Sequence, residues 1–203
     1  MGEKDDSASW INAPVPGTIM NALVQNGTYK NLYERDNMQK VPSEQFKHSW
    51  FYTRDFSLST IDKNSHYQLN FEGINYKANI WLNGKKLADT TTIVGAFNRF
   101  TLLIDSAVLE GINHLAIELF PPSIGAYTIG FVDWAPTPPD NNMGIFRDVE
   151  LKITRNVEIK NTFVYSKVNL NTLSEADLFV STEVVNYSNQ DQEITLEGKI
   201  AEL

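Results

Sequence analysis

Apolar and polar residues alternate along most of the chain with the period of two that is typical of β-strands. The alternating or strand-rich stretches are residues 50–56, 67–71, 78–82, 100–104, 115–119 and 149–153. The dipeptide Asn83-Gly84 follows one of them and predicts a tight hairpin turn of type I′. Many short strands separated by turn residues predict an all-β fold, a β-sandwich of the jelly-roll type.

One short helix is expected near the start of the chain. The segment Pro14-Val15-Pro16-Gly17 is typical of extended backbone. Thr18 can then cap a helix over residues 19–26, and Gly27 suits the left-handed residue that ends it. Residues 30–47 are rich in charges and amides and are expected to form a loop.

A domain boundary is expected near Arg155-Asn156. The jelly roll then covers residues 1–155, and residues 156–203 begin a second domain with strands over 157–164, 176–186 and 192–201. A sandwich of the immunoglobulin type needs about seven strands. Three strands are too few, so we expect a truncated immunoglobulin-like domain and a chain cut from a longer protein.

Composition excludes several functional classes. The net charge is −8 and the basic residues are scattered, so neither a nucleic-acid face nor a membrane-binding face is expected. The chain has no cysteine, and its three histidines lie far apart, so we expect no metal site and no cofactor. An uncharged partner such as a carbohydrate is compatible with this net charge and with the scattered basic residues.

The first residues lack the basic and apolar regions of a signal peptide. The protein is therefore either not exported or has lost its leader, in which case the periplasm or secretion are the options. The sequence leaves the compartment open.

The stretch from Gly130 to Val149 carries the chemistry. Three prolines make it a loop rather than a core strand, and they stiffen it. It presents Asp133, Trp134, Asp140 and Asn142. An indole can stack on the apolar face of a pyranose, and carboxylates and amides hydrogen-bond its hydroxyls. On chemistry alone a structural interpretation is slightly favoured, in which Trp134 packs on the sandwich and Asp133 caps a turn.

Three blocks change that balance, because together they resemble the N-terminal sugar-binding domain of family 2 glycoside hydrolases. They are Ala13-Pro14-Val15-Pro16-Gly17-Thr18, then Phe71 to Lys85 followed by Gly95-Ala96-Phe97, and the loop that ends in Gly144-Ile145-Phe146-Arg147-Asp148-Val149. The run Phe131-Val132-Asp133-Trp134, with the prolines and Asn142-Met143-Gly144 after it, is most similar to the exo-β-D-glucosaminidase and mannosylglycoprotein endo-β-mannosidase branch.

The resemblance implies a galactose-binding-like jelly roll, an immunoglobulin-like domain and then a (β/α)8 barrel with two catalytic glutamates. That barrel would lie beyond residue 203, so no catalytic residue is assigned here. In relatives the matching loop lines the subsite for the non-reducing sugar. This implies substrate contacts for Asp133 and Trp134, and also for Asp140 and Asn142.

Two other functions remain open at this stage. The chain could be a stand-alone carbohydrate-binding module with no hydrolase partner, or a structural or adhesion sandwich without a ligand. If it is part of a hydrolase of β-glucosaminides or β-mannosides, residues 1–203 alone are expected to be inactive. The sugar, the linkage, exo or endo action and the oligomeric state are not given by the sequence.

Overall fold

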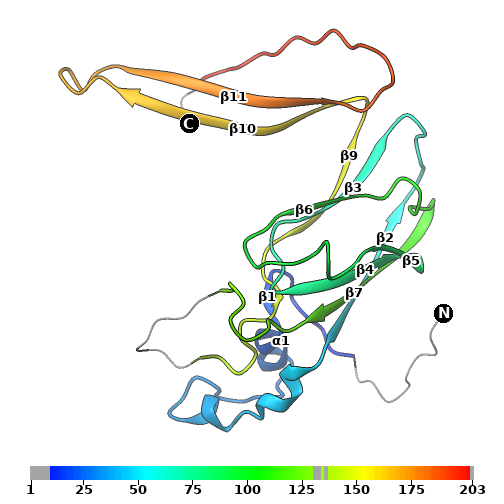
Figure 1. The fold of residues 1–203 in the computed structure, drawn as a ribbon, viewed down its shortest axis with the longest axis vertical. Coiled ribbons are helices and arrows are strands. Elements are labelled where there is room, and N and C mark those ends of the chain that lie inside the picture. Colours follow the sequence, from blue (N-terminus) through cyan, green and yellow to red (C-terminus); the bar gives the residue numbers. More distant parts are fainter. Residues whose placement is uncertain (1–9, 130–133, 135–136, 202–203) are drawn as a thin grey trace. The chain divides into compact units, whose positions relative to one another are not determined.

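The computed structural model describes residues 10–129, 134 and 137–201 (Figure 1). The chain divides into two compact units. The larger is formed by Met1–Ile61 and Tyr67–Lys152, and the smaller by Asp62–His66 and Ile153–Leu203. The assignment of the smaller unit to an immunoglobulin-like domain stays a prediction.

Two sheets form the sandwich of the larger unit. The four-stranded antiparallel sheet has the order β2-β7-β4-β5, and the three-stranded sheet has the order β6-β3-β9. The bounds are β2 Trp50–Leu58, β7 Gly111–Phe120, β4 Lys77–Leu82, β5 Lys85–Ala88, β6 Phe100–Leu103, β3 His66–Phe71 and β9 Val149–Thr154. A two-residue ribbon pairs β1 (Gly17–Thr18) with β8 (Gly144–Ile145). The all-β prediction is confirmed.

The core lies where the alternating pattern placed it. The inward residues of the central strands are buried: Leu69 and Phe71 in β3, Ala78, Ile80 and Leu82 in β4, and Leu115, Ile117 and Leu119 in β7. The hairpin turn between β4 and β5 is also confirmed, since Asn83 and Gly84 have φ values of 53° and 80°. A type I′ turn needs positive φ at both central residues.

The smaller unit contains an antiparallel ribbon of β10 (Val157–Val168) and β11 (Ala176–Asn186). The predicted strand over residues 192–201 is wrong, because that stretch has no regular secondary structure. A strand needs a neighbour for its backbone N–H and C=O groups, and no described residue pairs with this stretch. The pattern of side chains was strand-like, but the partner is missing.

The predicted helix is present as α1 (Ile19–Gln25). Thr18 caps it, with its hydroxyl accepting a bond of 3.1 Å from the Asn21 amide. The expected loop over residues 30–47 contains two short 3-10 helices, η1 (Asn37–Lys40) and η2 (Ser43–Lys47).

The start of α1 is fixed by the C-terminal half of the predicted sugar loop. The Ile19 amide donates to the Met143 carbonyl at 2.8 Å, and the Met20 amide donates to Asp140 Oδ2 at 2.9 Å. The other oxygen of Asp140 accepts from the Asn142 amide at 3.1 Å. Burial raises the pKa of the Asp140 carboxyl, and the hydrogen bonds from Met20, Asn142 and Thr18 oppose that rise.

A close backbone crossing holds the same segment against β1. A side chain at Gly144 would place its Cβ 2.4 Å from the Gly17 carbonyl oxygen and 2.6 Å from the Thr18 Cα. Only glycine fits this approach. The crossing therefore fixes where the loop returns to the sandwich.

Asn75 joins the two ends of the loop. Its side-chain nitrogen donates to the carbonyls of Asn141 and Asn142, at 3.0 and 2.8 Å, and its side-chain oxygen accepts from the Thr128 hydroxyl at 2.5 Å. Its backbone N–H and C=O each bond to Gly144 at 2.9 Å. Asn75 is completely buried. One side chain thus ties Thr128, just before the loop, to Asn141 and Asn142, which follow its prolines.

We expect Asp140→Asn to change how stability depends on pH. A carboxyl whose pKa is raised on folding stabilises most below its unfolded pKa of about 3.9, and that contribution is lost as pH rises through the folded pKa. The unfolding free energy of the wild type minus that of Asp140→Asn should therefore fall from acid to neutral pH in urea titrations.

Asp89→Asn is the matched control, because the hydrogen bond from the Thr91 hydroxyl, followed by that from the Thr91 amide, lowers the pKa of the exposed Asp89. Its contribution is present above the unfolded pKa and is lost as pH falls, so the corresponding difference should slope the other way. A flat or rising difference for Asp140→Asn contradicts the assignment.

The side-chain hydrogen bonds of Asn75 to Thr128, Asn141 and Asn142 are called the Asn75 clamp below. Asn75→Asp tests this clamp, because aspartate has nearly the same shape as asparagine. An aspartate cannot donate to the two carbonyls and leaves them unpaired, so we expect a loss of about 1–3 kcal/mol in unfolding free energy. The control is Asn98→Asp, since the side-chain amide of the exposed Asn98 donates to a single carbonyl among the described residues, that of Val94. Equal losses in the two variants would show that Asn75 has no special role.

Candidate functional site

The loop presents its tryptophan to solvent. The Trp134 side chain is 86% exposed, so it does not pack on the sandwich of this chain as the structural interpretation required. Asp133 lies outside the described residues. Thr137 is exposed beyond the tryptophan, and Pro138 and Pro139 lead back toward the clamp in half-buried positions. An exposed indole on a loop with anchored ends is available to a flat apolar ligand surface.

The structure brings Asp140 and Asn142 together but gives them different environments. Asp140 is 1% exposed, and its oxygens are engaged by backbone amides, which favours a role in holding the loop. Asn142 is half-buried with φ of 56°, and its side-chain amide makes no hydrogen bond to another described residue. Of the two, Asn142 has the free polar group that a ligand could use.

An aromatic pair that the sequence did not single out stands beside the clamp. The rings of Phe97 and Tyr127 lie 5.3 Å apart at 52°, and they are 59% and 82% exposed. Tyr127 directly precedes Thr128, which bonds to Asn75. Phe97 ends the Gly95-Ala96-Phe97 block, and that block was the available signal. Its partner is 30 residues away, so no local pattern could pair them.

One charged group of the second sequence block, Glu72, is engaged in an ion pair. Glu72 and Arg99 form an ion pair at 2.8 Å, which gives Glu72 a surface role. Among the described residues there is no cluster of three metal-ligating side chains. The described helices include none that is long and apolar enough to cross a membrane.

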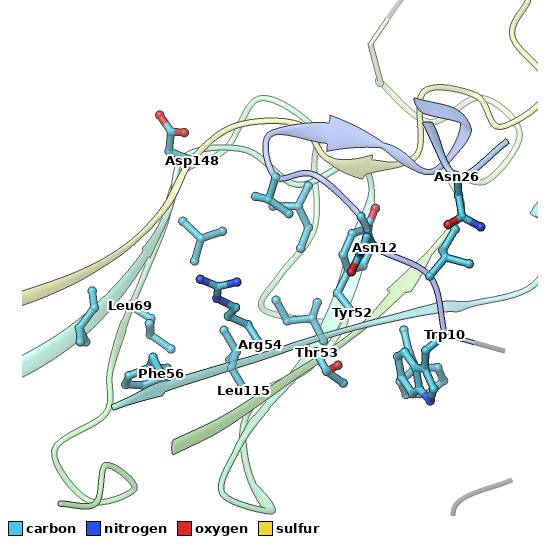
Figure 2. A pocket seen from close by; sticks show the side chains of 18 residues that line it. Trp10, Asn12, Asn26, Tyr52, Thr53, Arg54, Phe56, Leu69, Leu115 and Asp148 are labelled. Atoms are coloured by element: carbon cyan, nitrogen blue, oxygen red, sulfur yellow. The ribbon is translucent and has the colours of Figure 1, made fainter. Parts of the chain in front are cut away.

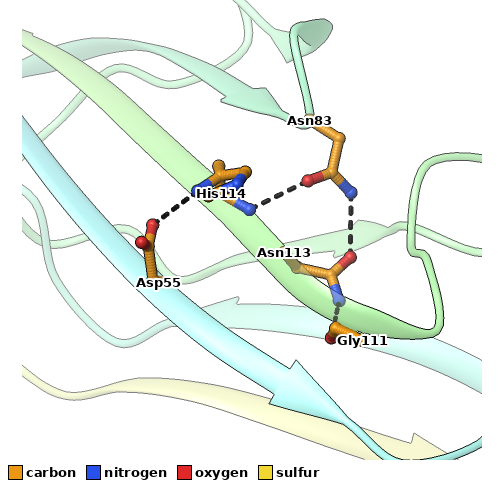
Figure 3. Close-up of polar contacts among 5 residues, drawn as sticks. All are labelled: Asp55, Asn83, Gly111, Asn113 and His114. Atoms are coloured by element: carbon orange, nitrogen blue, oxygen red, sulfur yellow. Dashed lines mark hydrogen bonds and ion pairs between the residues drawn. The ribbon is translucent and has the colours of Figure 1, made fainter.

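A second polar cluster lies at the other end of β7 (Figure 3). Asp55 contacts His114 Nδ1 at 2.8 Å, and Asn83 links the His114 amide to the Asn113 side chain, each at 2.8 Å. Nucleophilic catalysis would need a hydroxyl or thiol on the other ring nitrogen. No described hydroxyl bonds there, so the cluster serves to join the β4–β5 turn to the start of β7.

A cavity of about 840 Å³ lies between the sheets next to β2 (Figure 2). Polar and apolar groups share its wall about equally, and Tyr52, Arg54 and Asp148 are among the polar ones. Burial raises the pKa of Tyr52 to about 12; a backbone hydrogen bond from Ile145 opposes this rise, and the nearby Asp140 charge adds to it. Among the described residues predicted to bind substrate, none lines this cavity.

Comparison with known proteins identifies the family. Residues 2–126 match the model described as the glycosyl hydrolase 2 galactose-binding domain-like family. The chain is 36% identical over 196 residues to an exo-β-D-glucosaminidase of Amycolatopsis orientalis, covering 96% of this chain and 19% of that protein. It is 28% identical over 216 residues to a mannosylglycoprotein endo-β-mannosidase of Lilium longiflorum, covering 94% and 22%.

The fold agrees with a solved structure. The crystal structure of the Amycolatopsis orientalis exo-chitosanase superposes with a TM-score of 0.81 at 36% identity, covering 89% of this chain and 21% of that one. The chain thus spans about a fifth of the length of these relatives. The resemblance seen in the three sequence blocks is confirmed, and so is the branch. The chain belongs to the glycosyl hydrolase 2 galactose-binding domain-like family.

Proposed function

We propose that the intact protein is a family 2 glycoside hydrolase that releases a β-linked sugar from a non-reducing end, with glucosamine favoured over mannose. In this proposal the sandwich supplies one wall of the sugar subsite. The observation that carries it is the exposed Trp134 on a loop whose two ends are tied by Asn75. The named activity of the relatives supports the same assignment.

The anchored loop suits recognition of a sugar. An indole stacks on the C–H face of a pyranose, and this contact excludes water from one side of the ring. Binding costs less entropy when the protein group is already ordered. The clamp at Asn75 and the three prolines reduce the freedom of the segment that holds Trp134.

The polar residues of the loop take separate roles in the proposal. The Asp133 carboxylate and the Asn142 amide contact the sugar, whereas the buried Asp140 holds α1 and the loop in place. Glucosamine carries an ammonium group at neutral pH, and a carboxylate attracts it more strongly than it attracts a hydroxyl.

Chemistry is assigned to a barrel in the remaining part of the intact protein. Retaining hydrolysis needs two carboxyl groups about 5–5.5 Å apart, one as nucleophile and one as acid and then base. No catalytic carboxyl pair is assigned to residues 1–203. The contribution of this chain is to position the sugar, which holds the anomeric carbon at the barrel entrance.

The first test is hydrolysis of aryl β-D-glucosaminides and aryl β-D-mannosides by the full-length protein and by residues 1–203. We expect turnover of the glucosaminide by the full-length protein, and turnover no faster than buffer by the 203-residue chain. Turnover by the short chain would contradict the assignment of chemistry to the barrel. Sugar binding without hydrolysis in both proteins would favour a stand-alone carbohydrate-binding module instead.

The second test is Trp134→Ala in the full-length protein. Loss of stacking should lower kcat/KM by about tenfold or more, because tenfold corresponds to about 1.4 kcal/mol. The control is Leu109→Ala, since Leu109 is an exposed apolar residue that precedes β7, whereas the loop follows β7. Equal kcat/KM in wild type and Trp134→Ala would remove Trp134 from the subsite.

A further inference from the structure

Two exposed aromatic rings, those of Phe97 and Tyr127, pack against each other beside the Asn75 clamp and are called the aromatic pair here. Their centroids lie 5.3 Å apart with an interplanar angle of 52°, which is a tilted arrangement that aromatic side chains prefer. The two residues are nevertheless 59% and 82% exposed. Each ring therefore limits the movement of the other, while much of both surfaces stays open to a ligand.

The turn that carries Phe97 is anchored on both sides of the ring. The Gly95 amide donates to the Tyr76 carbonyl at 3.0 Å, and the Ala96 side chain is buried. On the other side, the Asn98 side chain donates to a backbone carbonyl of the same turn at 2.8 Å. Because the neighbours are bonded or buried, Phe97 is exposed on a backbone that is held in place.

Tyr127 is held by the residue that follows it. The Thr128 hydroxyl donates to the side-chain oxygen of Asn75 at 2.5 Å, and Asn75 is completely buried. Asn75 directly precedes Tyr76, whose carbonyl anchors the turn of Phe97. One dipeptide of the sandwich therefore sets the positions of both rings, although they lie 30 residues apart in the sequence.

The Asn75 carboxamide also fixes the base of the Trp134 loop. Its nitrogen donates to the carbonyls of Asn141 and Asn142 at 3.0 and 2.8 Å, while its oxygen accepts from Thr128. The aromatic pair and the base of the loop are therefore attached to the two ends of one side-chain amide. This places the pair next to the loop that is proposed to hold a sugar, so a second ring of the same ligand has an aromatic surface within reach.

The chemistry around the aromatic pair fits a carbohydrate. The segments 94–98 and 123–129 contain no charged residue, and glycines and alanines flank both rings. The Tyr127 hydroxyl makes no hydrogen bond to another described residue. An aromatic face stacks on the C–H face of a pyranose, and a phenol hydroxyl bonds to sugar hydroxyls. Phenylalanine and tyrosine also lose little conformational entropy on binding, since each has only two rotatable side-chain bonds.

We propose that Phe97 and Tyr127 form a second subsite, which binds the sugar ring that follows the one held at Trp134. The inference rests on the proposed function and adds to it a site for the second ring. When a sugar is released from a non-reducing end, the second ring belongs to the leaving group. The aromatic pair then supplies binding energy away from the cleaved bond, which raises kcat/KM for substrates with more than one ring.

Kinetics of the full-length protein on two matched substrates tests this subsite. They are a β-linked disaccharide and the methyl β-glycoside of the same sugar, glucosamine or mannose, whichever the wild type hydrolyses faster. Both present the same non-reducing ring, but the disaccharide alone presents a second one. We expect Tyr127→Ala and Phe97→Ala each to lower the ratio of kcat/KM for the disaccharide to that for the methyl glycoside by about three- to tenfold.

Three further variants serve as matched controls. Tyr127→Phe retains the ring and should keep most of the wild-type ratio. Phe97→Leu retains an apolar side chain without an aromatic face, so its ratio should fall as in Phe97→Ala. Trp134→Ala should lower kcat/KM for both substrates alike and leave the ratio unchanged, because the ring proposed to contact Trp134 is present in both.

Each contrary outcome identifies which claim fails. A ratio that stays at the wild-type value in Tyr127→Ala and Phe97→Ala overturns the second subsite, while the proposed function stands if Trp134→Ala still lowers kcat/KM. If these two variants also lower the melting temperature at an unchanged ratio, the aromatic pair is covered by protein and not by sugar. If the wild type hydrolyses neither glucosaminides nor mannosides, the proposed function fails and the subsite with it.

Discussion

The arrangement of the candidate site depends on the hydrogen bonds of one buried carboxamide. Asn75 bonds to Thr128 on one side of the loop and to Asn141 and Asn142 on the other, while its backbone pairs with Gly144. A loop with free ends would lose much entropy when it orders on a ligand. Because Thr128, Asn141 and Asn142 are all bonded to Asn75, the entropy of ordering is lost only by the residues between Thr128 and Asn141.

The return of the loop is fixed by two further contacts that share the same region. Gly144 crosses Gly17 so closely that no larger residue fits. Asp140, three residues after Thr137, accepts the Met20 amide at the start of α1. Helix, ribbon and carboxamide therefore hold the base of the loop together, and Trp134 within the loop is exposed. A buried, polar base and an exposed, aromatic tip are what a preformed sugar wall requires.

Local patterns were sufficient for much of the fold. The alternation in β4 and β7, the Asn83-Gly84 turn and the Thr18 cap each depend on neighbours within a few residues, and all were predicted. The site was predicted only in part. The Asn75 clamp spans 66 and 67 residues in sequence, and the Phe97–Tyr127 pair spans two loops, so no spacing rule could find them. The predicted strand over 192–201 is wrong because pairing, too, is not local: the stretch has a strand-like pattern, but no described strand pairs with it.

The most direct measurement of the central claim is a crystal structure of the full-length protein with a glucosamine-configured inhibitor. The result we expect is a sugar ring in van der Waals contact with the Trp134 indole, within about 4–4.5 Å, with Asn75 still bonded to Asn141 and Asn142. An inhibitor bound at the barrel entrance while Trp134 lies out of contact would contradict the claim that this loop forms a wall of the sugar subsite.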